Sequence, residues 1–126
     1  MTDNARDLTG VRVLVVDDDD DIRKISLLVL DGRAAHSLGV DSVRGAEDLL
    51  ADHEVDVIVT DMVMPGLTGR QFLDWLTVEH PAIPVVAMSG VPDQLLAAAQ
   101  RPNVRSTLDK PFSVDALVDA VQGAVA

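Results

Sequence analysis

The chain has 126 residues, 48% of them hydrophobic, which predicts a single globular domain with an apolar core. Its formal net charge of −11 makes direct binding to nucleic acid or to an anionic membrane unfavourable. The absence of cysteine excludes disulfides and thiolate metal sites. The polar N-terminus lacks the pattern of a secretory signal, and no apolar run approaches the length of a membrane span. We therefore expect a soluble, cytoplasmic protein.

Five short apolar runs alternate with five segments of helical periodicity along the chain. The apolar runs predict strands at residues 11–16, 40–43, 55–60, 84–88 and 104–108. The periodic segments predict helices at residues 22–30, 46–51, 70–78, 93–100 and 114–125. Strands that are apolar on both faces and alternate with helices belong in a parallel sheet covered on both sides. The predicted fold class is α/β, an open doubly wound (βα)5 sandwich with a five-stranded parallel sheet.

The predicted domain organisation is simple. Residues 1–10 are expected to be a flexible lead-in, and residues 11–126 are expected to form the domain. Internal repeats, low-complexity tracts and linkers are absent from the sequence, so we predict no second domain.

Polar residues follow several of the predicted strands at the point where each strand ends. Asp17 and Asp18 follow the first strand, Asp61 the third, Ser89 the fourth and Lys110 the fifth. In open parallel sheets, ligands bind beyond the carboxyl ends of the strands, where the strand order reverses. We therefore expect these side chains to meet at one edge of the sheet.

The chemistry of this set points to phosphoryl transfer. Three carboxylates a few ångströms apart repel one another unless a cation offsets their charge, and oxygen ligands without histidine or cysteine suit Mg²⁺. Lys110 and Ser89 can contact phosphate oxygens. Asp61, at the centre of the sheet, is the best-placed carboxylate to attack phosphorus and hold an acyl phosphate.

The remaining members of the five-aspartate run have a different expected role. Asp19, Asp20 and Asp21 stand just before the first predicted helix. Aspartate caps the free N–H groups at a helix start and complements the positive end of the helix dipole. We therefore do not assign these three residues to the metal.

Four motifs together resemble the receiver domain of two-component response regulators, over residues 11–125. They are VLVVDDDDDIR, IVTDMVMPGLTG, PVVAMSG and DKPF, each at the end of the expected strand. The resemblance implies a flavodoxin-like strand order 2-1-3-4-5. It also implies a signalling domain, with no enzymatic role beyond assisting its own phosphorylation and dephosphorylation. Asp61 would receive a phosphoryl group from a phosphohistidine on a sensor histidine kinase or a histidine phosphotransfer protein, altering the binding of a downstream protein partner.

The same resemblance assigns roles to individual residues. It implies that Mg²⁺ is held by Asp17, Asp18, Asp61 and the backbone carbonyl of Val63. It implies that the phosphate is contacted by Ser89 and Lys110. The residues expected to shape the backbone around the site are Pro65, Gly66, Gly90 and Pro111. Pro65 and Gly66 also predict a turn from their residue types alone.

The sequence departs from the pattern of this family in several places. Thr107 stands at the switch position, where many receivers carry an aromatic residue that turns inward on activation. The segment between Asp18 and Gly39 is longer than usual, which predicts either an extension of the first helix or a bulged loop. Val63 and Val91 flank the expected path of the attacking water. Without an output domain after Ala126, the chain could be a stand-alone regulator or part of a hybrid kinase.

Two other classes of site would use the same aspartates. In a haloacid-dehalogenase-like phosphatase, Asp17 would be the nucleophile of a D-x-D motif completed by Asp19, although the chain lacks an obvious cap insertion. In a calcium-binding EF-hand loop, Asp17, Asp19 and Asp21 would be ligands, but Ile22 occupies the position where that loop requires glycine.

Overall fold

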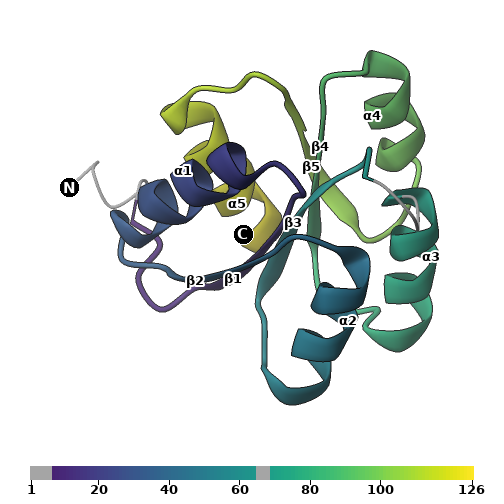
Figure 1. Ribbon diagram of the computed structural model, residues 1–126, viewed down its shortest axis with the longest axis horizontal. Coiled ribbons are helices and arrows are strands. Elements are labelled where there is room, and N and C mark those ends of the chain that lie inside the picture. Colours follow the sequence, from purple (N-terminus) through teal and green to yellow (C-terminus); the bar gives the residue numbers. More distant parts are fainter. Residues whose placement is uncertain (1–6, 65–68) are drawn as a thin grey trace.

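In the computed structural model, which describes residues 7–64 and 69–126, five parallel strands form one sheet in the order β2-β1-β3-β4-β5 (Figure 1). The strands are β1 (Arg12–Val16), β2 (His36–Val40), β3 (Val57–Asp61), β4 (Val85–Ser89) and β5 (Val104–Asp109). The helices are α1 (Asp20–Asp31), α2 (Val43–Asp52), α3 (Gly69–Glu79), α4 (Pro92–Ala99) and α5 (Val114–Val125). The predicted (βα)5 fold and its strand order are confirmed.

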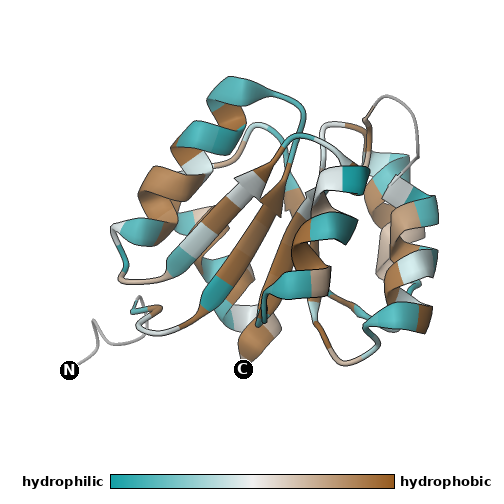
Figure 2. Ribbon diagram, turned by 60° about the horizontal axis from the view of Figure 1, so that its bottom comes forward, coloured by the Kyte–Doolittle hydropathy of each residue, from teal (hydrophilic) through white to brown (hydrophobic). Residues whose placement is uncertain are grey.

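The sheet divides the apolar core into two clusters. Helices α1 and α5 cover one face, and helices α2, α3 and α4 cover the other (Figure 1). Side chains alternate between these clusters along β1, since Val13 and Val15 pack toward α1 and α5 while Leu14 and Val16 pack toward the opposite helices. Figure 2 shows the apolar strands at the centre of the sheet and polar stretches along the helices. This burial on both faces explains why the central strands are continuous apolar runs.

Helix α1 begins at Asp20, two residues before the predicted start, and Asp19 is its cap residue. The Asp19 side chain accepts hydrogen bonds from the backbone N–H groups of Asp21 and Ile22, at 3.0 and 3.1 Å. Asp20 and Asp21 lie in the first turn, where negative charge is favourable. The expected capping role of the second half of the aspartate run is therefore confirmed.

The predicted position of the second strand was wrong. Residues 36–40 form β2, with His36 opposite Arg12, whereas Val43 is buried in the first turn of α2 after the cap residue Ser42. The expected helix extension or bulge after Arg33 was also wrong, because α1 ends at Asp31 and the chain soon enters the sheet. Strand β2 lies at the sheet edge and is partly exposed, so it lacks the apolar signal of the central strands.

The packed part of the domain extends further toward the N-terminus than the expected boundary at residue 11. Leu8 is only 1% exposed and belongs to the cluster beneath α1 and α5. Its backbone N–H donates to the carbonyl of Arg33, and Gly10 N–H donates to the carbonyl of Ala34. These contacts fix residues 8–10 against the turn between α1 and β2.

A small aromatic group lies on helix α3. The rings of Phe72 and Trp75 are stacked with their centroids 6.2 Å apart, and the Trp75 ring lies 5.4 Å from that of His80. Phe72 is fully buried, whereas Trp75 is partly exposed. Both residues pack on the sheet face that α2, α3 and α4 cover.

Candidate phosphoacceptor and metal site

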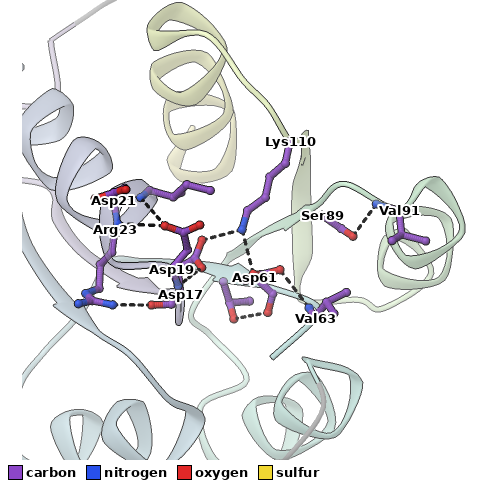
Figure 3. Close-up of polar contacts among 11 residues, drawn as sticks. Asp17, Asp19, Asp21, Arg23, Asp61, Val63, Ser89, Val91 and Lys110 are labelled. Carbon is purple, nitrogen blue, oxygen red and sulfur yellow. Dashed lines mark hydrogen bonds and ion pairs between the residues drawn. The ribbon is translucent and has the colours of Figure 1, made fainter. Parts of the chain in front are cut away.

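The carboxyl ends of the strands bring the predicted site residues together. Asp17 directly follows β1, Asp61 is the last residue of β3, Ser89 is the last residue of β4, and Lys110 follows β5. The parallel register places Val16 opposite Thr60, so the next residues, Asp17 and Asp61, emerge side by side. Figure 3 shows Asp17, Asp61, Ser89 and Lys110 gathered at this edge of the sheet.

Three carboxylates form the acidic site, which we define as Asp17, Asp18 and Asp61. One oxygen from each lies within 4.8 Å of the others. Asp17 is fully buried and Asp61 is 5% exposed, whereas Asp18 is exposed to solvent. Three carboxylate oxygens, with solvent reaching the group on the side of Asp18, fit Mg²⁺, which binds a few protein oxygens and keeps several waters.

Lys110 bridges two of these carboxylates. Its Nζ atom donates to Asp17 Oδ2 at 2.8 Å and to Asp61 Oδ2 at 2.9 Å. Burial alone would lower the pKa of Lys110, but the hydrogen bonds to Asp17 and Asp61 raise it overall. The ammonium group is therefore held in its charged form between the carboxylates.

The negative charge of Asp17 is unfavourable in its buried position, even with its hydrogen-bond partners. Burial raises the pKa of its carboxyl, although hydrogen bonds from Lys110 and from the backbone N–H of Asp19 oppose the shift. One lysine beside three carboxylates leaves the acidic site short of positive charge, because the desolvation cost of a buried carboxylate is only partly offset. A further cation would reduce this imbalance.

Two short backbone contacts complete the edge of the site. Val63 N–H donates to Asp61 Oδ1 at 3.0 Å, and Val91 N–H donates to Ser89 Oγ at 2.9 Å. Val63 and Val91 remain about half exposed, at 53% and 46% of the residue surface. Both valines therefore present apolar surface to solvent close to Asp61 and Ser89 (Figure 3).

The residues expected to shape the backbone have different outcomes. Pro65 and Gly66 lie outside the described residues. The peptide bond between Lys110 and Pro111 is cis. A Cβ atom added at Gly90 would meet only ordinary contacts, the nearest being the Lys110 carbonyl oxygen at 3.6 Å. The structure therefore gives no steric reason for a glycine at position 90.

Gly69, which the sequence analysis did not single out, has a clear steric reason. It begins α3, and a Cβ atom there would lie 2.6 Å from the Cα atom of Met62. Met62 directly follows Asp61, so the first turn of α3 packs against the backbone that carries Asp61. The sequence offered only a weak signal, a glycine at the start of a helical pattern.

Arg23 is the last residue of the motif VLVVDDDDDIR, but the sequence analysis gave it no role of its own. Its guanidinium donates to the backbone carbonyl of Asp17 at 2.8 Å and to the Asp20 carboxylate at 2.5 Å. Arg23 lies six residues after Asp17, and the carbonyl that it contacts belongs to the peptide unit between Asp17 and Asp18. Helical spacing alone could not reveal it, because Asp17 lies before the helix begins.

The competing interpretations of the aspartate run lose their support. Asp19 caps α1 and so serves the helix, rather than forming the second half of a D-x-D motif or a calcium loop.

Thr107 lies in β5 opposite Ala87, with an exposed side chain. The position predicted to act as a switch therefore carries a small hydroxyl on the surface of the edge strand.

Another charged group lies at the opposite, amino end of the same strands. Arg12, at the start of β1, donates through Nε and NH2 to the two carboxylate oxygens of Asp56, at 3.0 and 2.9 Å, and through NH1 to Glu54 at 3.3 Å. The hydrogen bond from Arg12 lowers the pKa of Asp56 and outweighs the opposing effect of burial. In this exposed group the charged form of Asp56 is therefore favoured by its arginine partner.

None of the helices in the described residues is both long enough and apolar enough to span a membrane. The model of the response regulator receiver domain family matches residues 13–122. The chain is 32% identical to the C4-dicarboxylate transport transcriptional regulatory protein DctD of Pseudomonas aeruginosa, over 90% of the chain and 25% of that protein. It is 32% identical to the sensor kinase CckA of Brucella abortus, over 95% of the chain and 13% of that protein.

Solved structures of receiver-containing proteins have the same fold as this chain. A response regulator receiver domain protein from Clostridium thermocellum superposes with a TM-score of 0.82 and 25% identity, over 91% of this chain and 94% of that chain. NtrX from Brucella abortus superposes with a TM-score of 0.88 and 26% identity, over 93% of this chain and 27% of that chain. The chain thus spans about a quarter of the length of relatives such as DctD and NtrX.

Proposed function

The chain belongs to the response regulator receiver domain family of two-component signalling, and from this premise we propose that Asp61 is its phosphoacceptor. The observation that carries the proposal is the acidic site, in which Asp61 lies with Asp17 and Asp18 while Lys110 Nζ is 2.9 Å from its carboxylate. Asp61 also ends the central strand β3, which pairs with β1 and β4, and Asp61 itself lies opposite Met88 of β4.

The proposed reaction transfers a phosphoryl group from a phosphohistidine on a sensor histidine kinase or a histidine phosphotransfer protein. A carboxylate oxygen of Asp61 forms a bond to phosphorus as the phosphorus–nitrogen bond breaks, and the imidazole keeps the bonding electrons and ends as neutral histidine after taking up a proton. The domain assists its own phosphorylation and dephosphorylation and acts on no separate substrate. The cytoplasmic location expected from the sequence stays a prediction.

Mg²⁺ would be held by Asp17, Asp18, Asp61 and the carbonyl of Val63, and it would offset charge on the phosphoryl oxygens. Lys110 is the protein's own cation for the same purpose. It already lies against Asp61, and its flexible stem lets the ammonium group follow a phosphoryl oxygen.

Ser89 is proposed to contact the phosphoryl group through its hydroxyl hydrogen. Its oxygen accepts the N–H of Val91, and a hydroxyl that accepts one hydrogen bond can still donate another. A turn of this side chain toward Asp61 would alter the contact at Val91, just before α4. We propose that this change alters the binding of a downstream protein partner, since Thr107 cannot supply an aromatic switch.

Val63 and Val91 are proposed to lengthen the lifetime of the phosphorylated state. Hydrolysis of an acyl phosphate needs a water held in line with the bond that breaks, and neither valine side chain can hydrogen-bond a water. Both side chains are exposed beside the contacts that hold Asp61 and Ser89. They would therefore cover the approach to phosphorus without ordering a water there.

The test is to incubate the protein with Mg²⁺ and acetyl phosphate and to map the acyl phosphate by mass spectrometry. We expect modification at Asp61 and complete loss of labelling in Asp61→Asn. A matched control is Asp56→Asn, at the opposite end of the sheet, which should be labelled like the parent. Undiminished labelling of the Asp61→Asn variant would overturn the assignment, and labelling at Asp17 would favour a phosphatase.

A further inference from the structure

Arg23 reaches back from the first turn of α1 to the end of β1. Its side chain is only 17% exposed, which is unusually low for an arginine. One arm of the guanidinium donates to the Asp17 carbonyl at 2.8 Å (Figure 3). The other arm donates to the Asp20 carboxylate at 2.5 Å. The planar fork of arginine therefore ties the backbone of the acidic site to the start of the helix.

The neighbouring strand leaves space for this side chain. Gly39 lies on β2 opposite Val15. A Cβ atom added at Gly39 would lie 3.1 Å from both Cγ and Cδ of Arg23, and 2.9 Å from Cδ1 of Leu27. The stem of Arg23 is therefore confined by β2 on one side, while its head is fixed by two hydrogen bonds.

The carbonyl that Arg23 holds belongs to the peptide unit that joins Asp17 to Asp18. On the Asp17 side, the carboxylate is fixed by Lys110 and by the N–H of Asp19. Asp18 is exposed, so packing does little to orient it. The orientation of its side chain depends instead on the orientation of the peptide unit before it.

We propose that Arg23 is a positioning residue for the metal site, acting through the Asp17 carbonyl to aim Asp18 toward a bound Mg²⁺. The inference rests on the proposed function, in which the acidic site holds this ion. Groups that orient metal ligands without touching the metal commonly change its affinity 10-fold to 100-fold when removed. Because one hydrogen bond to a main-chain oxygen is at stake, we expect about the lower value.

An opposite effect of Arg23 makes the proposal testable by its sign. A guanidinium near the carboxylates repels Mg²⁺, although its ion pair with Asp20 reduces this effect. If Arg23 acted only through its charge, Arg23→Gln would bind Mg²⁺ more tightly and Arg23→Lys would bind it as the parent does. If Arg23 positions Asp18, Arg23→Gln binds more weakly and Arg23→Lys recovers part of the loss.

The experiment is a calorimetric titration with Mg²⁺ alone, at fixed pH and ionic strength, without any phosphodonor. We expect Mg²⁺ affinity to fall about tenfold in Arg23→Gln and by less in Arg23→Lys. Gly39→Ala keeps the charge but crowds the stem of Arg23, so it should also weaken binding. Asp20→Asn is the matched control, because it removes the second partner of the guanidinium and leaves the contact with Asp17.

Melting temperatures without Mg²⁺ show whether each variant is folded, and Arg23→Lys and Gly39→Ala carry the test if Arg23→Gln is not. Equal or tighter Mg²⁺ binding by the folded Arg23 variants would overturn the inference while leaving the proposed function intact. A parent protein that bound no Mg²⁺ at millimolar concentration, and was indistinguishable from Asp18→Asn, would instead contradict the metal site itself.

Discussion

The two ends of strand β1 carry charged groups that look alike in sequence and differ in physical character. At the amino end, Arg12 meets Asp56 and Glu54 on an exposed surface, with 44%, 36% and 89% of the side chains accessible. At the carboxyl end, Lys110 meets a fully buried Asp17 and an Asp61 side chain that is 8% accessible. Each group links β1 to a neighbouring strand, but only one of them is removed from water.

The pKa directions of the two aspartates express this difference. The hydrogen bond from Arg12 lowers the pKa of Asp56, whereas burial raises the pKa of Asp17 despite its lysine partner. The exposed pair thus favours the charged form, and the buried site resists it. A cluster that is unfavourable to the empty protein and suited to a cation is better explained by binding than by stability.

Of the variants that test the difference between the buried and exposed ends of β1, Lys110→Met is expected to have the largest effect on stability. Removing the ammonium leaves two nearly buried carboxylates without their cation, so the free energy of unfolding at neutral pH should fall by about 2–3 kcal/mol without Mg²⁺. Urea denaturation measures this change. Added Mg²⁺ should recover part of the loss, because it replaces some of the missing positive charge.

Arg12→Met is the matched control at the exposed end, where screening by water and salt leaves the pair with little net energy. It should lower stability far less than Lys110→Met. Equal losses in the two variants would show that burial does not separate the two ends, and the contrast would fail.

The next effect concerns the lifetime of phosphorylated Asp61. The double variant Val63→Asn, Val91→Glu places hydrogen-bonding groups where the parent has apolar side chains, so loss of phosphate should be about tenfold faster, equivalent to about 1.4 kcal/mol in the barrier. Decay is followed by mass spectrometry after removal of the phosphodonor, in excess Mg²⁺ and at fixed pH.

The labelled residue should remain Asp61 in this double variant. Leu96→Gln, a polar substitution of another exposed apolar side chain on α4, serves as a control for surface polarity. If the double variant lost phosphate no faster than the parent, water access at these two positions would not limit the lifetime.

The smallest effects are opposite changes in stability for Asp17→Asn and Asp56→Asn in the absence of Mg²⁺. A raised pKa in the folded state means that Asp17 favours folding at low pH, and this contribution is lost as pH rises through the folded-state pKa. A lowered pKa means that Asp56 favours folding above its ordinary pKa, and this contribution is lost as pH falls through the folded-state value. At pH 7, Asp17→Asn should therefore melt a few degrees higher or at the parent temperature, and Asp56→Asn slightly lower.

Melting curves from pH 3 to pH 8 check both signs. The advantage of Asp17→Asn should shrink toward acid pH, and so should the deficit of Asp56→Asn. A clear fall in the melting temperature of Asp17→Asn at pH 7 would show that Asp17 is primarily structural.

Much of this architecture could be predicted from sequence because its determinants are local. The buried strands β3 and β4 are continuous apolar runs, and each site residue occurs where such a run stops. The helix cap at Asp19 is likewise a matter of a few adjacent residues. The predicted position of strand β2 was wrong because this position depends on pairing with β1, while the residues of β2, HSLGV, are of mixed polarity.

Gly69 and Arg23, to which the sequence assigned no role, act through contacts with residues outside their own helices. Gly69 is needed because α3 approaches the backbone of Met62, and Arg23 matters because its fork reaches the carbonyl of Asp17. The bridge from Lys110 to both Asp17 and Asp61 joins residues 93 and 49 positions apart. Residue type indicated that a lysine would serve the site, but only the fold shows which carboxylates it contacts.

The stacked pair on α3 makes the protein its own optical probe. Trp75 is the only tryptophan and the chain has no tyrosine, so ultraviolet emission comes from a single position. That position lies in the layer of α2, α3 and α4, against Phe72. Fluorescence will therefore follow the loosening of this layer, whereas circular dichroism averages over all the helices. Coincident fluorescence and circular dichroism transitions during denaturation would indicate that both layers unfold together. A circular dichroism change that precedes the fluorescence change would indicate that the layer of α1 and α5 unfolds first.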